Sequence, residues 1–168
     1  MRSLAHLERI FALGAHSVGT AHLLFNGSLS AQSDGRSALE HHLGYKIPDE
    51  IATFISIFGG TELFVDSFGL GIKILPFQKI YETNIGMEEF KEQFFPRYVI
   101  FGFDSTDDML CLYCHESNVH FGILDHEAWG QPDIWASEAM IFVKFSNWLD
   151  FLIETGEAIP PSALRYET

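Results

Sequence analysis

A run of apolar residues between positions 48 and 58 has the spacing of an amphipathic helix. The apolar positions repeat at i, i+3, i+4 and i+7, which places them in one stripe. They are Ile51, Phe54, Ile55 and Phe58. Pro48 suits the first helical position, and the two acidic residues after it favour the positive end of the helix dipole. Gly59 and Gly60 offer a left-handed exit, so we predict a short core helix with both ends marked.

The same spacing predicts helices elsewhere in the chain. They cover about the first dozen residues and residues 37–43, 77–81, 87–94 and 145–155. Gly44 and Gly156 follow two of them and mark their ends. Residues 13–25 show no regular pattern, and residues 26–36 are rich in turn formers. We therefore expect mainly helix before residue 60.

After Gly60 the apolar pattern changes to short runs bounded by glycine or polar residues, which is typical of strands. These runs are residues 62–66, 69–75, 98–103, 109–114 and 119–124. Helices flanking such a run predict a single α+β domain with a central, mostly antiparallel sheet of about five to six strands. We expect an N-terminal helical extension and loop over residues 1–36, the domain over 37–156, and a flexible tail over 157–168.

Composition narrows the classes of function. The 168 residues include 10 Lys plus Arg against 23 Asp plus Glu, which gives a formal charge of -13. This charge repels nucleic acid and anionic membrane surfaces and favours encounter with a basic partner. Cys111 and Cys114 are the only cysteines, as in proteins of a reducing cytosol. With no apolar run long enough to span a bilayer, we expect a cytoplasmic protein.

The motifs that suggest catalysis or metal binding are better explained by structural roles. Cys111-Leu-Tyr-Cys114-His115 has the form of a haem attachment site, but it falls in a predicted strand, where the spacing puts the cysteines on opposite faces. His115, His120 and Asp125 lack a recognised zinc spacing. The sequence contains no Gly-x-Ser-x-Gly motif. We therefore predict no catalytic residue, no metal and no cofactor, with a metal-dependent enzyme at these three residues as a lesser alternative.

Several short patterns, taken in order, resemble the SUKH superfamily, which is named after a fungal cell-wall-synthesis regulator and a set of bacterial toxin-immunity proteins. The resemblance covers about residues 37–156 and includes Asp107-Asp108 ahead of a strand and Glu40 ahead of the first glycine. The residues that carry the structural part of the pattern are Leu43, Gly44, Pro48, Phe54, Gly59, Gly60, Gly102, Phe145, Trp148 and Leu149. The first 35 residues have no counterpart in the pattern.

This resemblance implies a non-catalytic binding protein, namely an immunity protein that neutralises a cognate secreted toxin such as a nuclease. The alternative is a regulatory scaffold of the cell-wall-assembly type that binds endogenous partners. For a toxin with a basic surface, the candidate contacts are acidic residues and two loop tryptophans, which could instead cover the sheet edge. They are Glu62, Asp66, Asp104, Asp107, Asp108, Glu116, Asp125, Trp129 and Trp135.

Overall fold

The strands of this protein lie in one sheet in the order in which they follow along the chain. A computed structural model describes residues 2–29, 35–115, 118–128, 131 and 140–159. Within these ranges eight strands pair as antiparallel neighbours from β1 to β8. They are β1 (Ala15–Val18), β2 (Ala21–Asn26), β3 (Glu62–Val65), β4 (Ile72–Ile74), β5 (Tyr98–Phe103), β6 (Met109–His115), β7 (Asn118–Leu124) and β8 (Met140–Val143).

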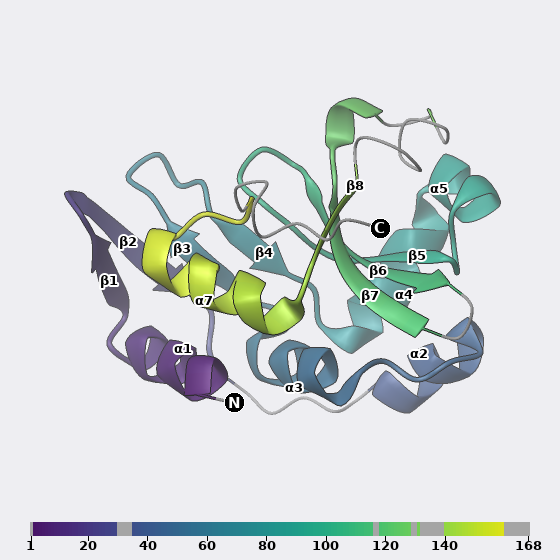
Figure 1. Cartoon of the computed structure of the whole chain (residues 1–168), viewed down its shortest axis with the longest axis horizontal. Coiled ribbons are helices and arrows are strands. Elements are labelled where there is room, and N and C mark those ends of the chain that lie inside the picture. Colours follow the sequence, from purple (N-terminus) through teal and green to yellow (C-terminus); the bar gives the residue numbers. More distant parts are fainter. Residues whose placement is uncertain (1, 30–34, 116–117, 129–130, 132–139, 160–168) are drawn as a thin grey trace.

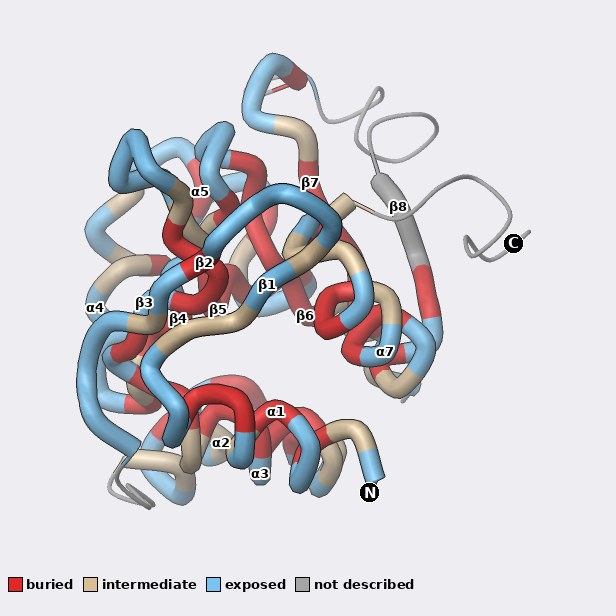
Figure 2. Tube along the Cα trace, turned by 90° about the vertical axis from the view of Figure 1, so that its left-hand side faces the viewer, coloured by how far each residue is buried: buried red, intermediate tan, exposed pale blue. Residues whose placement is uncertain are grey.

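Helices cover both faces of the sheet (Figures 1 and 2). They are α1 (Arg2–Ala12), α2 (Arg36–Leu43), α3 (Asp49–Phe58), α4 (Phe77–Gly86), α5 (Glu88–Gln93) and α7 (Phe145–Thr155), with one 3₁₀ turn, η1 (His126–Ala128). The larger hydrophobic cluster joins the sheet to α1, α3 and α7. A smaller cluster lies on the other face of β5–β7 and contains Phe90 of α5 and Phe94, which follows that helix. The architecture is therefore α+β, as the sequence predicts.

Trp148 occupies the centre of the larger cluster. Its side chain is fully buried, and its ring packs against Phe54, Phe121 and Phe145 with centroid separations of 4.8–6.0 Å. The indole Nε1–H donates a hydrogen bond of 2.7 Å to the carbonyl oxygen of Ala158, which is itself buried. Trp148 thus ties α7, α3 and β7 together and anchors the chain after α7.

The sheet has more strands than predicted, because three strands escaped the sequence patterns. The hairpin β1–β2 lies where no regular structure was expected, whereas α1, α2 and α3 confirm the expectation of mainly helix before residue 60. Leu23 is the only fully buried residue of this hairpin, which leaves almost no alternation to detect. The third strand that the sequence patterns did not predict is β8, which is four residues long. The division of the chain at residues 36 and 156 stays a prediction, and residues 160–168 lie outside the described part.

The ends of α3 differ in detail from the prediction. Pro48 is the residue before the first turn and not its first residue. Gly59 is extended, with φ of −61°, and a Cβ there would lie 2.6 Å from the carbonyl oxygen of Ile55. Gly60 has φ of +88° and supplies the left-handed exit. The two glycines therefore serve two purposes, close approach of backbones and chain reversal.

A side-chain network sets the corner between α2 and α3. Glu40 Oε1 accepts hydrogen bonds from Arg36 Nε at 2.8 Å and from the Ile47 backbone N–H at 3.1 Å. Arg36 Nη2 also donates to Asp49 Oδ1 at 2.9 Å. This network explains why a glutamate precedes the Leu43-Gly44 pair in the sequence pattern.

Replacement of Asn84 by alanine should lower the free energy of unfolding by about 2–3 kcal/mol. The buried Asn84 amide donates to the carbonyl oxygens of Ile80 and Ile100 and accepts from the Ile100 N–H, at 2.7–2.9 Å. Alanine would leave buried backbone groups of β5 without partners. Urea denaturation measures the change, with the exposed Gln78→Ala of the same helix as control. A loss no greater than that of the control would contradict this role.

Candidate functional site

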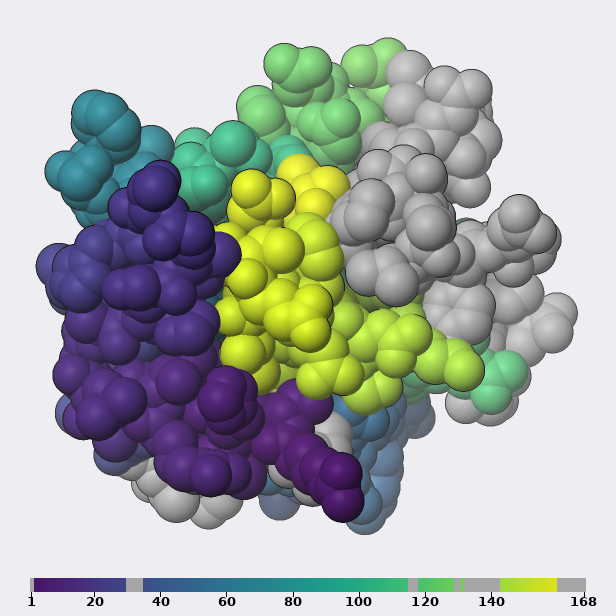
Figure 3. All heavy atoms as spheres, turned by 60° about the vertical axis from the view of Figure 1, so that its left-hand side comes forward, coloured from purple at the N-terminus to yellow at the C-terminus, as the bar shows by residue number. Residues whose placement is uncertain are grey.

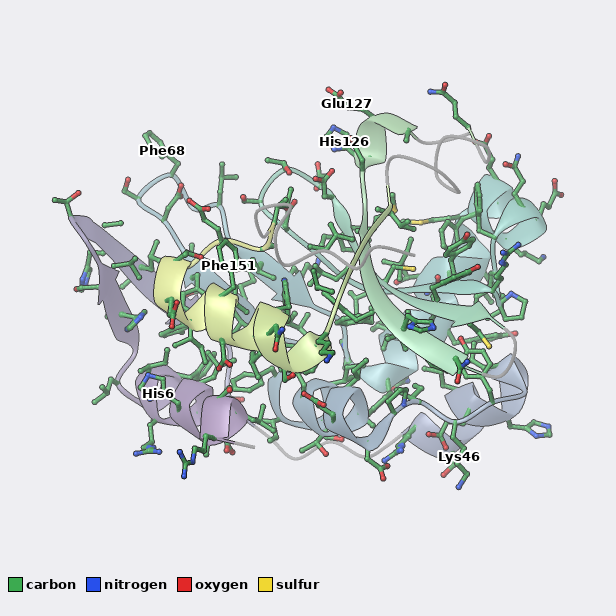
Figure 4. All side chains as sticks on the ribbon, in the orientation of Figure 1. His6, Lys46, Phe68, His126, Glu127 and Phe151 are labelled. Atoms are coloured by element: carbon green, nitrogen blue, oxygen red, sulfur yellow. The ribbon has the colours of Figure 1, made fainter. Side chains whose placement is uncertain are left out.

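Alternate turns of the sheet meet at one end of the molecule. In an antiparallel meander the connections β3–β4, β5–β6 and the exit of β7 lie at the same end. We call this surface the turn rim and define it as residues 66–71, 104–108 and 125–127. Figure 4 shows Phe68, His126 and Glu127 along this edge, away from His6 and Lys46.

The aspartates of the β3–β4 and β5–β6 turns shape their own loops. Asp66 Oδ1 accepts the backbone N–H groups of Phe68 and Leu70 at 2.8 and 3.0 Å. Asp104 Oδ1 accepts the N–H and hydroxyl of Thr106 and the N–H of Asp108, at 2.8–2.9 Å. Asp104 is largely buried, whereas Asp107 is exposed in a left-handed conformation with φ of +68°. The two loops are therefore held rigid by side chains that the sequence assigned to partner binding.

The corner after β7 is joined to the β5–β6 turn through a carboxylate and an imidazole. Asp108 Oδ1 accepts from the His126 backbone N–H at 3.0 Å and lies 2.7 Å from His126 Nδ1. The hydrogen bond with Asp108 raises the pKa of His126 above its usual value. Asp125 Oδ1 accepts the Glu127 N–H at 2.8 Å. The contact between Asp108 and His126 connects the β5–β6 turn to the corner after β7, so that the two turns form one surface.

The three ligand atoms of Asp108, Asp125 and His126 lie within 4.8 Å of one another, a spacing that could hold a metal ion. The hydrogen bond between Asp108 Oδ1 and His126 Nδ1 already engages two of them. Of the set suggested by sequence, the His115 side chain lies outside the described part, and the structure does not bring His120 and Asp125 together. His120 pairs with Tyr113 near the start of β7, whereas Asp125 follows its end.

Apolar side chains project from the same rim. Phe68 is 87% exposed and Leu70 is 51% exposed, at the tip of the β3–β4 turn. Beside them lies a pocket of about 390 Å³ with apolar walls that include Leu23, Phe64 and Ile72. Its remaining walls come from the β5–β6 turn and from the residues after α7. Figure 3 shows α7 and the residues after it, in yellow, beside the purple N-terminal elements.

A family profile described as the SMI1 / KNR4 family (SUKH-1) matches residues 36–154. The chain belongs to this family. A comparison with curated proteins gives no match. Membership is consistent with a toxin-immunity or a regulatory role.

The SUKH-1 match begins at α2, so α1, β1 and β2 lie outside it. These elements nevertheless contribute Leu4, Leu7, Ile10, Phe11 and Leu23 to the main core. Within the described residues, no helix is both long and apolar enough to cross a membrane.

The structure brings five of the nine predicted contact residues to the turn rim. They are Asp66, Asp104, Asp107, Asp108 and Asp125. Glu62 is not among them, since it begins β3 at the opposite end and accepts a hydrogen bond from Asn26 at 3.1 Å. Glu116, Trp129 and Trp135 lie outside the described residues. Whether any of the nine binds a partner stays a prediction.

The predicted contact set does not include Phe68, Leu70, His126 or Glu127, which the structure places on the turn rim. A signal for Phe68 was available in Asp66-Ser-Phe-Gly69, because an apolar residue in a tight turn between two strands has no core to reach.

The two cysteines follow the prediction that they lie on opposite faces of their strand. Cys111 is buried in the smaller cluster, where burial raises its thiol pKa, and Cys114 is half-buried three residues along the same strand.

The imidazole of His126 should titrate above the ordinary histidine value of about 6.5. Because the folded pKa is raised, the contribution of this pair to stability is present below that value and is lost as the pH rises through the folded pKa. Asp108→Asn should return the pKa toward 6.5. NMR titration of the His126 ring signals measures the pKa in the native protein and in Asp108→Asn. A peptide of residues 124–128 serves as the unfolded reference. A His126 pKa equal to that of the peptide would contradict the pairing.

Proposed function

We propose that this SUKH-1 protein is a non-catalytic immunity protein that binds and neutralises a secreted toxin with a basic surface, such as a nuclease. The observation that carries the proposal is the convergence of acidic turns and an exposed phenylalanine at the turn rim. Family membership supplies the class of role, and the rim supplies a surface of suitable chemistry.

The rim combines two properties of protein-binding surfaces. Exposed aromatic side chains are frequent anchors of interfaces, and Phe68 is the most exposed large apolar residue among those described. Carboxylates around it attract a cationic surface and raise the rate of encounter. The hydrogen bonds described above for Asp66 engage Oδ1, and Asp107 is exposed on the same rim, so these carboxylates can meet an incoming lysine or arginine. Because the loops are fixed before binding, less conformational entropy is lost on association.

Inhibition would follow from occlusion of the toxin's cationic substrate groove by the rim. Co-expression of the full chain with each toxin encoded beside its gene tests this function. Survival of cells with one such toxin, and death without the chain, is the expected result. Failure to protect against every one of them would contradict the immunity role and favour the regulatory role.

Neutralisation of two exposed rim carboxylates should slow association with the suppressed toxin by about three- to tenfold at low salt. The variant is Asp107→Asn with Glu127→Gln, which spares Asp104 and Asp108 because they hold the turns. Stopped-flow or surface-based kinetics across a salt series measures the rate and its salt dependence, which should flatten. The matched control removes the same charge from α1 and α4, by Glu8→Gln with Glu82→Gln. Equal slowing by both variants would contradict steering by the rim.

A further inference from the structure

A second surface feature lies away from the rim, where the starts of α3, β7 and α7 meet. It is a groove of about 280 Å³ with mostly apolar walls. Its walls include Glu50, Ile51, Val119, His120, Lys144, Phe145 and Ser146. We call it the Glu50 groove. It adjoins the first half of β7, whereas the turn rim follows the end of that strand.

Glu50 Oε1 is buried and has no hydrogen-bond partner, and it is the only such side-chain atom among the described residues. A buried acceptor without a donor is costly, and folded proteins rarely retain one without a reason. The start of α3 favours the negative charge of Glu50, but a helix dipole does not replace a hydrogen bond. Glu50 lines the groove, and its carboxylate therefore brings an acceptor without a donor to this surface.

The walls and the acceptor together indicate the chemistry of the missing donor. Apolar walls suit an aliphatic stem, and a carboxylate at depth suits a cationic head with several N–H groups. Lys144 does not meet this need, since it is exposed and forms no ion pair with Glu50 in the described structure. Arginine fits better than lysine, because its planar guanidinium is more weakly hydrated and offers five donors.

We propose that the Glu50 groove receives an arginine side chain of a partner protein, with the guanidinium donating to the Glu50 carboxylate. The site is separate from the turn rim, so this proposal does not depend on the proposed function. A partner that reaches both surfaces would contact the molecule at two points along β7.

Titration of the ¹⁵N-labelled full chain with Nα-acetyl-arginine methylamide tests the proposal. The probe should cause saturable shifts at the amides of Glu50, Ile51, Val119 and Ser146. The citrulline analogue has nearly the same shape but no charge, and it should bind at least about tenfold more weakly. Glu50→Gln should weaken arginine binding by a similar factor and leave citrulline binding unchanged.

Unchanged amide dispersion away from the groove will show that Glu50→Gln is folded, and Glu8→Gln serves as a control for loss of one charge elsewhere. Equal binding of arginine and citrulline, or arginine binding that survives Glu50→Gln, would overturn the proposal. Saturable shifts confined to the turn rim would also overturn it, while leaving the proposed function intact.

Discussion

Trp148→Ala should lower the free energy of unfolding by about 3–5 kcal/mol, the range for truncation of a buried aromatic residue. Trp148 is fully buried among the rings of Phe54, Phe121 and Phe145, so the cavity would open between helices and sheet. The Ala158 carbonyl would also lose its donor. Domains of this size are stable by only about 5–15 kcal/mol, so this loss is a large share of the total stability. Urea denaturation followed by far-UV circular dichroism measures the difference.

Trp148→Phe provides the matched variant, because it keeps an aromatic ring and removes the N–H donor. Its loss should be smaller, about 1–3 kcal/mol, from reduced volume and from the unpaired carbonyl. A loss below about 1 kcal/mol for Trp148→Ala would contradict the central position assigned to this residue.

Phe68→Ala should weaken binding to the suppressed toxin by about 30-fold, which corresponds to about 2 kcal/mol. The ring is 87% exposed in the free protein, so its burial can occur only at an interface. For the same reason the free energy of unfolding should change by less than about 0.5 kcal/mol. Isothermal titration calorimetry measures the affinity, and denaturation of the free variant checks its stability.

Leu13→Ala is the control for this change, since Leu13 is 78% exposed and lies just beyond α1, away from the rim. It should leave the affinity unchanged. An equal effect of the two substitutions, or no effect of Phe68→Ala, would argue against Phe68 as an anchor.

The sequence predicted best those elements whose burial repeats at a fixed period. In α3 and α7 the buried residues fall at the predicted positions, and Gly60 and Gly156 have the positive φ angles expected after helices. The strands β5, β6 and β7 were also predicted within one or two residues, because they are rich in apolar residues and separated by polar turns. Here local pattern and tertiary burial agree.

The hairpin β1–β2 could not be predicted in this way, because its strands are stabilised by pairing and not by an alternating apolar face. Leu24 is exposed, and His16 reaches α7 through its ring, with Nε2 at 3.0 Å from the Ile153 carbonyl oxygen. Such contacts depend on residues far away in the chain. Pairing with β3 then continues the sheet, a contact that local spacing does not encode.

The candidate site was predictable in composition but not in the role of each residue. Acidic turns were recognised, yet the sequence does not distinguish Asp104 and Asp108, which hold loops, from the exposed Asp107. That distinction requires the geometry of both turns. The same holds for Glu50, which the sequence assigned to the helix dipole and which the structure places in a groove without a donor.

Amide hydrogen exchange of the full chain, free and saturated with the toxin that it suppresses, tests the central claim most directly. Binding at the turn rim should slow exchange over residues 66–71, 104–108 and 125–127, with little change at the exposed start of α1. Protection confined to surfaces outside these three turns would contradict the account.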